Sequence, residues 1–79
     1  MFNNTILFET QIEELDEIKE FNDGEKALTR FYCQSRLYNR RIECIFWKRA
    51  KNLKIGDKVK LNGFINKRGQ FIVKDLLVF

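Results

Sequence analysis

The chain has 79 residues, 44% of them hydrophobic, which is enough for one small domain. Two cysteines without a histidine cannot form the usual four-ligand zinc site, and they are too few for a disulfide scaffold. No segment reaches the roughly 18 consecutive apolar residues of a membrane helix, and the N-terminus lacks the layout of a signal peptide. We therefore expect one cytoplasmic domain over residues 1–79, with no metal, no cofactor and no membrane partner.

The formal net charge of +4 hides a strong asymmetry along the chain. Residues 1–25 hold eight acidic side chains and one basic, a net of −7. Residues 26–79 hold fourteen basic and three acidic, a net of +11. Part of the surface should then be strongly basic, which favours a polyanionic partner, although ordinary solvation by lysines would give the same counts.

The first predicted strand covers residues 5–19 and ends before the turn sequence Asn22-Asp23-Gly24. Its second half also fits a helix, because Ile12, Leu15, Ile18 and Phe21 recur every three residues among charged ones. We favour a long, bent strand for residues 11–21, because local propensity gives way readily to strand pairing. A helix there would make the fold α+β.

Four further strands are predicted at residues 26–37, 40–48, 58–65 and 70–79. The dipeptide Tyr38-Asn39 joins the first two of these, and the turn of residues 66–69 joins the last two. Between residues 48 and 58 the β pattern stops, and a basic stretch is followed by Gly56-Asp57. The sequence thus predicts an all-β fold of five strands, with one short helical turn between strands 3 and 4.

A two-residue loop at Tyr38-Asn39 would fix the pairing of strands 2 and 3 so that facing residue numbers sum to 77. One face is then a core face. The other face carries aromatic and guanidinium groups of the kind that stack on bases and contact phosphates. An anion between Arg36 and Arg41, which would lie opposite each other, would relieve their repulsion. The core face would pair Phe31 with Phe46, Cys33 with Cys44, and Ser35 with Ile42; the outer face would pair Arg30 with Trp47, Tyr32 with Ile45, Gln34 with Glu43, and Arg36 with Arg41.

The stretch from Ile42 to Gly63 resembles the bacterial-type single-stranded-DNA-binding (SSB) proteins and related OB-fold modules. It contains a strand ending in an aromatic residue, a short basic turn, a glycine turn and a Val59-x-Leu61-x-Gly63 strand. The resemblance implies a five-stranded OB-fold barrel, and it implies that Trp47, which closes the third strand, stacks on DNA. It follows the chain in pattern but is specific only in this stretch. SSB proteins also have a long clamping hairpin, where this chain has the turn of residues 66–69.

We therefore predict a non-catalytic protein that binds single-stranded DNA with little sequence specificity, in replication or recombination, and that forms a homo-oligomer. Alternatives stay open: RNA in place of DNA, an OB-fold module that docks a replication or recombination protein, Trp47 as a cap on the core, and Phe64 as a dimer contact. An enzyme is disfavoured because no histidine, and no serine or cysteine beside a base, is present. The predicted nucleic-acid-binding residues are Arg30, Tyr32, Arg36, Arg40, Arg41, Ile45, Trp47, Lys48, Phe64, Lys67 and Arg68.

Overall fold

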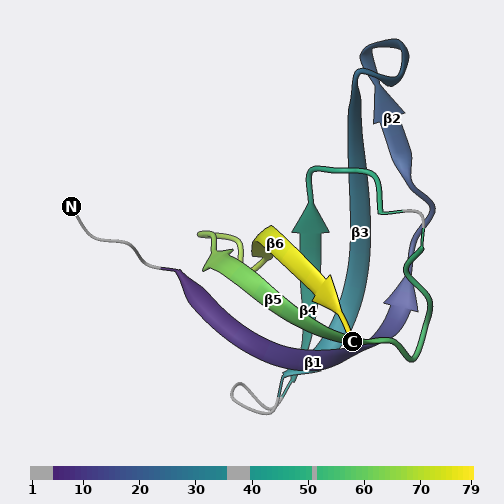
Figure 1. Ribbon diagram of the computed structural model, residues 1–79. Helices are drawn as coiled ribbons and strands as arrows, with labels where there is room; N and C mark the ends of the chain where they lie inside the picture. The colour runs from purple at the N-terminus through teal and green to yellow at the C-terminus, as the bar shows by residue number, and fades with distance from the viewer. Residues whose placement is uncertain (1–4, 36–39, 51) are drawn as a thin grey trace.

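The computed structural model describes residues 5–35, 40–50 and 52–79. Within these ranges the chain forms six strands and one short 3-10 turn, η1. Figure 1 shows β1 curving beneath the other strands, with the β2–β3 hairpin extending away from them. The elements are β1 (Ile6–Leu15), β2 (Lys19–Phe21), η1 (Asn22–Gly24), β3 (Lys26–Ser35), β4 (Arg40–Phe46), β5 (Lys58–Ile65) and β6 (Phe71–Val78).

The sheet closes into a barrel because β1 pairs with two different strands. The strand order is β1-β5-β6-β4-β3-β2, and an additional β1–β3 pairing joins the two sides. Residues 6–11 of β1 pair with β5, whereas residues from Ile12 to Leu15 pair with β3 across a register shift. Such a bulge bends a strand and allows it to turn a barrel corner. β1 and its short continuation β2 thus form the predicted long first strand, and residues 11–21 are not a helix.

Alternating side chains from all five barrel strands fill the interior. Phe31 and Phe71 are the largest fully buried side chains, and the ring of Phe8 packs edge-on against Phe71 at 4.9 Å between centroids. Gly63 lies where β5 and β6 approach each other closely, since an added Cβ would sit 2.0 Å from the carbonyl oxygen of Ile72. The predicted all-β OB barrel of five strands is confirmed.

The pairing of β3 with β4 differs from the predicted one by two residues. The observed pairs sum to 75, so Phe31 faces Cys44 and Cys33 faces Ile42. The last described pair is Ser35 with Arg40. A shift of two residues leaves every side chain on its predicted face, whereas a shift of one would have reversed them all. The predicted loop and Arg36 lie outside the described residues.

The prediction of a short helical turn between strands 3 and 4 is also wrong. The described part of residues 47–57 forms bends and turns. Two local backbone hydrogen bonds, from Leu53 N–H to Ala50 O at 3.5 Å and from Asp57 N–H to Lys54 O at 3.1 Å, form single turns, and long-range bonds hold the chain to β1. The backbone N–H of Gly56 donates to Ile12 O at 2.8 Å, and that of Ile12 donates to Asp57 O at 3.0 Å. Leu53, 6% exposed, reaches the core from this connection. The 3-10 turn η1 lies instead between β2 and β3.

Across the described residues, no helix is long and apolar enough to cross a membrane.

Candidate nucleic-acid interface

A row of side chains runs across four strands on the outside of the barrel. Arg30 of β3 pairs with Ile45 of β4, Ile45 with Ile72 of β6, and Ile72 with Phe64 of β5. Paired residues lie on the same face of a sheet, so the four side chains are successive neighbours. Phe64 is 36% exposed, and the Lys74 ammonium lies 5.7 Å from the centre of its ring. This row, named here the central row, combines apolar surface with a cation at each end.

Carboxylates already neutralise the arginine end of the central row. The Nε of Arg30 donates to Asp16 at 2.7 Å, and one of its Nη atoms lies 3.5 Å from Glu43. The hydrogen bond that Arg30 donates to Asp16 is the main reason that the pKa of Arg30 is raised above its ordinary value. A phosphate at this guanidinium would therefore have to compete with two carboxylates that already neutralise its charge.

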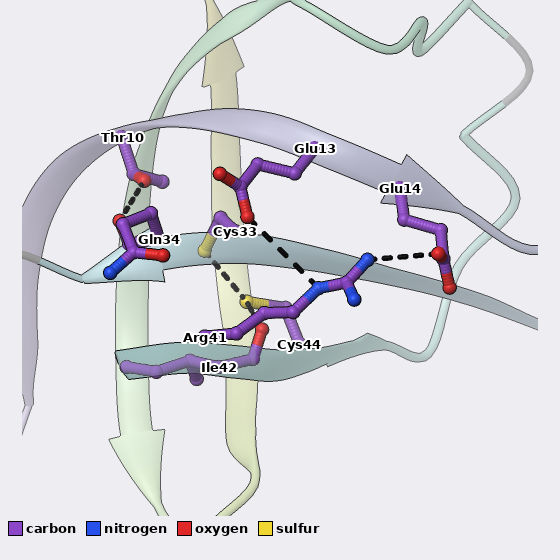
Figure 2. Close-up of polar contacts among 8 residues, drawn as sticks. All are labelled: Thr10, Glu13, Glu14, Cys33, Gln34, Arg41, Ile42 and Cys44. Carbon is purple, nitrogen blue, oxygen red and sulfur yellow. Dashed lines mark hydrogen bonds and ion pairs between the residues drawn. The ribbon is translucent and has the colours of Figure 1, made fainter. Parts of the chain in front are cut away.

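Arg41 is neutralised in the same way, as Figure 2 shows: its side chain extends from β4 across β3 toward two carboxylates of β1. Its nitrogens lie 2.9 Å from Glu14 and 4.0 Å from Glu13. The same guanidinium lies 5.0 Å from the ring centre of Tyr32, a cation–π contact. Partial burial raises the pKa of Tyr32. The face of this ring is therefore occupied by Arg41, and the observed partner of Arg41 across the ladder is Gln34, not Arg36.

Trp47 lies at the end of β4 and is 57% exposed, so it does not cap the core. Its ring lies 6.1 Å from that of Phe21, which is itself 42% exposed and ends β2 just before the η1 turn. The fully buried Thr29 holds the segment after Trp47, because its hydroxyl donates to Lys48 O at 2.7 Å and accepts from Ala50 N at 3.1 Å. A core residue of β3 thereby holds the backbone just beyond the exposed Trp47.

Basic residues surround this aromatic pair. Lys26 is paired with Phe21 in the β2–β3 ladder, and Lys48 and Arg49 follow Trp47 in the chain. An open hollow of about 500 Å³, lined by Lys26, Trp47, Lys48 and Arg49 together with Gly24 and Glu25, lies between the hairpin and this segment. Arg49 is bound to Glu20 at 2.7 Å. Among the described residues, Lys26 and Lys48 form no ion pair. We call this region the hairpin end.

Three other predicted residues gather at the opposite end of β4. Arg40 begins the strand, and its Nη2 would lie 3.7 Å from a Cβ placed on Gly69. Gly69 belongs to the turn that carries Lys67 and Arg68, both exposed. The carboxamide oxygen of Asn66 shapes this turn by accepting from the backbone N–H groups of Arg68 and Gln70. A β4 strand of seven residues spans about 20 Å, so this group is well separated from Trp47.

The two cysteines lie inside the barrel and take no part in this surface. Their sulfur atoms are 3.4 Å apart, and both residues are fully buried (Figure 2). The hydrogen bond with Cys33 and burial raise the pKa of Cys44. Among the residues that the structure describes, no three His, Cys, Asp or Glu side chains gather as metal ligands would.

Of the eleven predicted site residues, the structure brings Trp47 and Lys48 together at the hairpin end, and Arg40 together with the turn of Lys67 and Arg68. Arg30, Tyr32, Arg41, Ile45 and Phe64 lie between these groups, and Arg36 lies outside the described residues. The predicted set of site residues omitted five residues of this surface. Phe21 was assigned to the apolar pattern of its strand, and Ile72 carried no charge or ring to mark it. The five are Phe21, Lys26, Arg49, Ile72 and Lys74.

No protein-family model matches the chain, and no curated protein matches it. Solved structures do. The SSB domain of a protein from Synechococcus sp. superposes with a TM-score of 0.76 at 16% sequence identity, covering 96% of this chain and 96% of that one. Two structures of PriB from Ralstonia solanacearum give TM-scores of 0.73 and 0.75 at 14% and 12% identity. They cover 99% and 98% of this chain and 100% and 98% of PriB. At these identities, the likeness shows a shared OB fold.

Proposed function

We propose that this protein binds single-stranded DNA with little sequence preference, by base stacking and phosphate neutralisation, in replication or recombination. One observation carries the proposal: the single tryptophan is exposed at the end of a barrel strand, beside a second exposed ring and several basic side chains. Exposed aromatic rings next to cations are the features with which OB folds bind single strands. The likeness to an SSB domain supports the same function.

Stacking and charge contribute separately to such binding. A base stacked on Trp47 would contribute about 1–3 kcal/mol, whatever its identity, because every base has a π face. Lys26 and Lys48 would neutralise the flanking phosphates and release counterions, which makes the affinity fall as salt rises. The central row would continue the track over Ile45, Ile72 and Phe64. No step in this proposal breaks or forms a covalent bond.

Titration of Trp47 fluorescence tests the proposal directly, because the chain has one tryptophan. We expect oligo-dT to quench the emission in a saturable and salt-dependent way. A duplex of matched length should quench much less, because its bases are already stacked on each other. Oligo-rU, whose riboses carry the 2′-hydroxyl, in a parallel titration would compare RNA with DNA. Absence of oligo-dT binding, or equal binding of the duplex, would contradict the proposal.

The neutralised arginines favour a second candidate, a module that docks a replication or recombination protein. Arg30 and Arg41 lie in closed ion pairs, so the centre of the sheet offers apolar side chains and balanced charge in place of a basic track. Fully formed ion pairs and half-buried isoleucines suit a protein partner. If the protein binds oligo-dT no better than lysozyme, a generic basic protein, at the same salt concentration, this candidate becomes the better one.

We also propose that the protein forms a homo-oligomer. Leu7, Leu77 and Phe79 are each 60% exposed, and these large apolar side chains supply surface that a subunit contact would cover. Light scattering at micromolar concentration should return a multiple of the single-chain mass. The mass of one chain would contradict this expectation.

A further inference from the structure

We propose that Phe21 and Trp47 form a clamp that holds one unpaired nucleobase between their rings, an inference that rests on the proposed binding of single-stranded DNA. Nothing in the sequence pattern assigned Phe21 to binding. The structure brings it to Trp47 from a different strand, 26 positions earlier in the chain, with 6.1 Å between ring centres and 43° between ring planes. Both rings are exposed, so each already offers area to a ligand.

The two rings contact each other when no ligand is bound, because 6.1 Å between centres lies within the range of interacting aromatic pairs. A base sandwiched between parallel rings needs about 7 Å between their planes, twice the optimal carbon–carbon separation of about 3.5 Å. The observed ring planes are tilted by 43°. Insertion of a base therefore requires the two rings to separate and one of them to rotate.

The local structure allows the Phe21 side of the clamp to move. β2 has three residues, all exposed, and in the described chain it pairs with β3 alone. The turn that follows places Asn22, Asp23 and Gly24 at positive φ, so the hairpin reverses in very few residues. Trp47 is held more firmly, because Thr29 binds the backbone just beyond it. One fixed ring and one movable ring suit a clamp that closes on its ligand.

The cations around the rings define the ligand as a nucleotide within a single strand. Lys26 is paired with Phe21, Lys48 follows Trp47, and both lysines line the hollow beside Trp47, together with Glu25. These lysines would contact the phosphates that flank the clamped base. A duplex cannot enter, because both faces of each of its bases are covered by neighbouring bases. The clamp thus gives selection for single strands without readout of sequence.

Fluorescence anisotropy of a fluorescein-labelled dT oligomer of about 12 nucleotides tests the clamp with a double-mutant cycle. We expect Phe21→Ala and Trp47→Ala each to weaken binding by about 5- to 150-fold, the loss of one stacked base. The double variant should bind the oligomer almost as well as the single variant with the lower affinity, because removing either ring already destroys the sandwich. Phe64→Ala removes an exposed ring outside the clamp. When it is combined with Trp47→Ala, the two fold-losses in affinity should multiply.

Phe21→Leu keeps apolar volume at the hairpin and guards against a folding artefact. Its unfolding temperature, measured by circular dichroism, should equal that of the wild type. Its affinity for the oligomer should still fall nearly as far as that of Phe21→Ala. The clamp is overturned if Phe21→Ala and Phe21→Leu both bind within twofold of the wild type, or if the Phe21 and Trp47 losses multiply. In either case the binding of single-stranded DNA stands. If the wild type itself does not bind the oligomer, both proposals fail.

Discussion

The centre of the sheet and the hairpin end both carry basic side chains, but they differ in whether carboxylates neutralise them. At the centre, Arg30 and Arg41 are held by Asp16, Glu14 and other carboxylates. At the hairpin end, Lys26 and Lys48 form no ion pair among the described residues. A guanidinium on the right face of an OB barrel is therefore not automatically a phosphate site. Whether it can bind phosphate depends on the carboxylate that the fold brings to it.

The source of those carboxylates explains the charge asymmetry of the sequence. Four of the five ion pairs described join an arginine to an acidic residue of positions 13–20, on β1, on β2 or between them. The segment with a net charge of −7 thus lies against the basic part of the chain. It removes electrostatic attraction at the sheet centre, where a phosphate must compete with carboxylates. At the hairpin end Glu20 binds Arg49 and Glu25 lines the hollow, but Lys26 and Lys48 form no ion pair among the described residues.

The sharpest test of this comparison replaces one aromatic residue in each region. Trp47→Ala should weaken binding of oligo-dT by about 1–3 kcal/mol and leave the fold intact, because the ring is exposed. Tyr32→Ala should weaken it much less, since Arg41 already covers that ring. Ile55→Ala, at another exposed apolar residue of the same connection, is the control. Anisotropy titrations measure all three, and a Tyr32 effect as large as that of Trp47 would contradict the division into two regions.

The sequence predicted the strands and the faces well because both depend on alternation. A buried face needs every second side chain to be apolar, and this pattern survives a register shift of two residues. The predicted register of β3 and β4 was wrong, because it rested on the assumption of a two-residue loop at Tyr38-Asn39. The helical turn failed because hydrogen bonds from Thr29, Ile12 and Gly56 set the path of the connection.

The site was harder to predict because its members meet through tertiary contacts. The sequence indicated Trp47 and its neighbouring cations, which are close along the chain. It could not indicate that Phe21 reaches Trp47, or that Arg41 is bound by Glu14, because both contacts depend on strand pairing. The first arises because β2 and β4 both pair with β3, and the second because β1 pairs with β3. The excess of acid in residues 1–25 was a usable signal. It predicted complementary charge but not which arginines would be neutralised.

Thr29 links the core to the hairpin end, and its replacement should affect both stability and binding. Thr29→Val keeps the shape but leaves Lys48 O and Ala50 N without their partner, which should cost about 1–3 kcal/mol of unfolding free energy. Binding of oligo-dT should weaken several-fold, because the segment that follows Trp47 loosens. Urea denaturation and anisotropy measure the two effects. Thr29→Ser keeps the hydroxyl and should therefore retain most of the stability and most of the affinity. Unchanged stability of the valine variant would refute the link.

Salt dependence separates cations that contact phosphate from those that contact carboxylates. Lys26→Ala and Lys48→Ala should each lower the slope of log affinity against log salt by about 1. Arg41→Ala should lower it by clearly less, because Arg41 is bound by Glu14. Lys58→Ala, which removes an exposed lysine of β5, is the charge-matched control. A slope change for Arg41 equal to that for Lys26 would show that the sheet centre binds phosphate despite its carboxylates.

The smallest effect should come from releasing an arginine at the sheet centre. Glu14→Gln removes the closer of the two carboxylates on Arg41, while Glu13 stays 4.0 Å away. An ion pair this exposed is worth about 0.2–1 kcal/mol, so oligo-dT affinity should rise by at most about fivefold and the salt slope should steepen. Glu9→Gln makes the same change of charge on the same strand without releasing Arg41, so it controls for net charge. If the affinity of the two variants rises equally, the cause is long-range electrostatic attraction. If only the affinity of Glu14→Gln rises, β1 restrains binding because its Glu14 occupies Arg41.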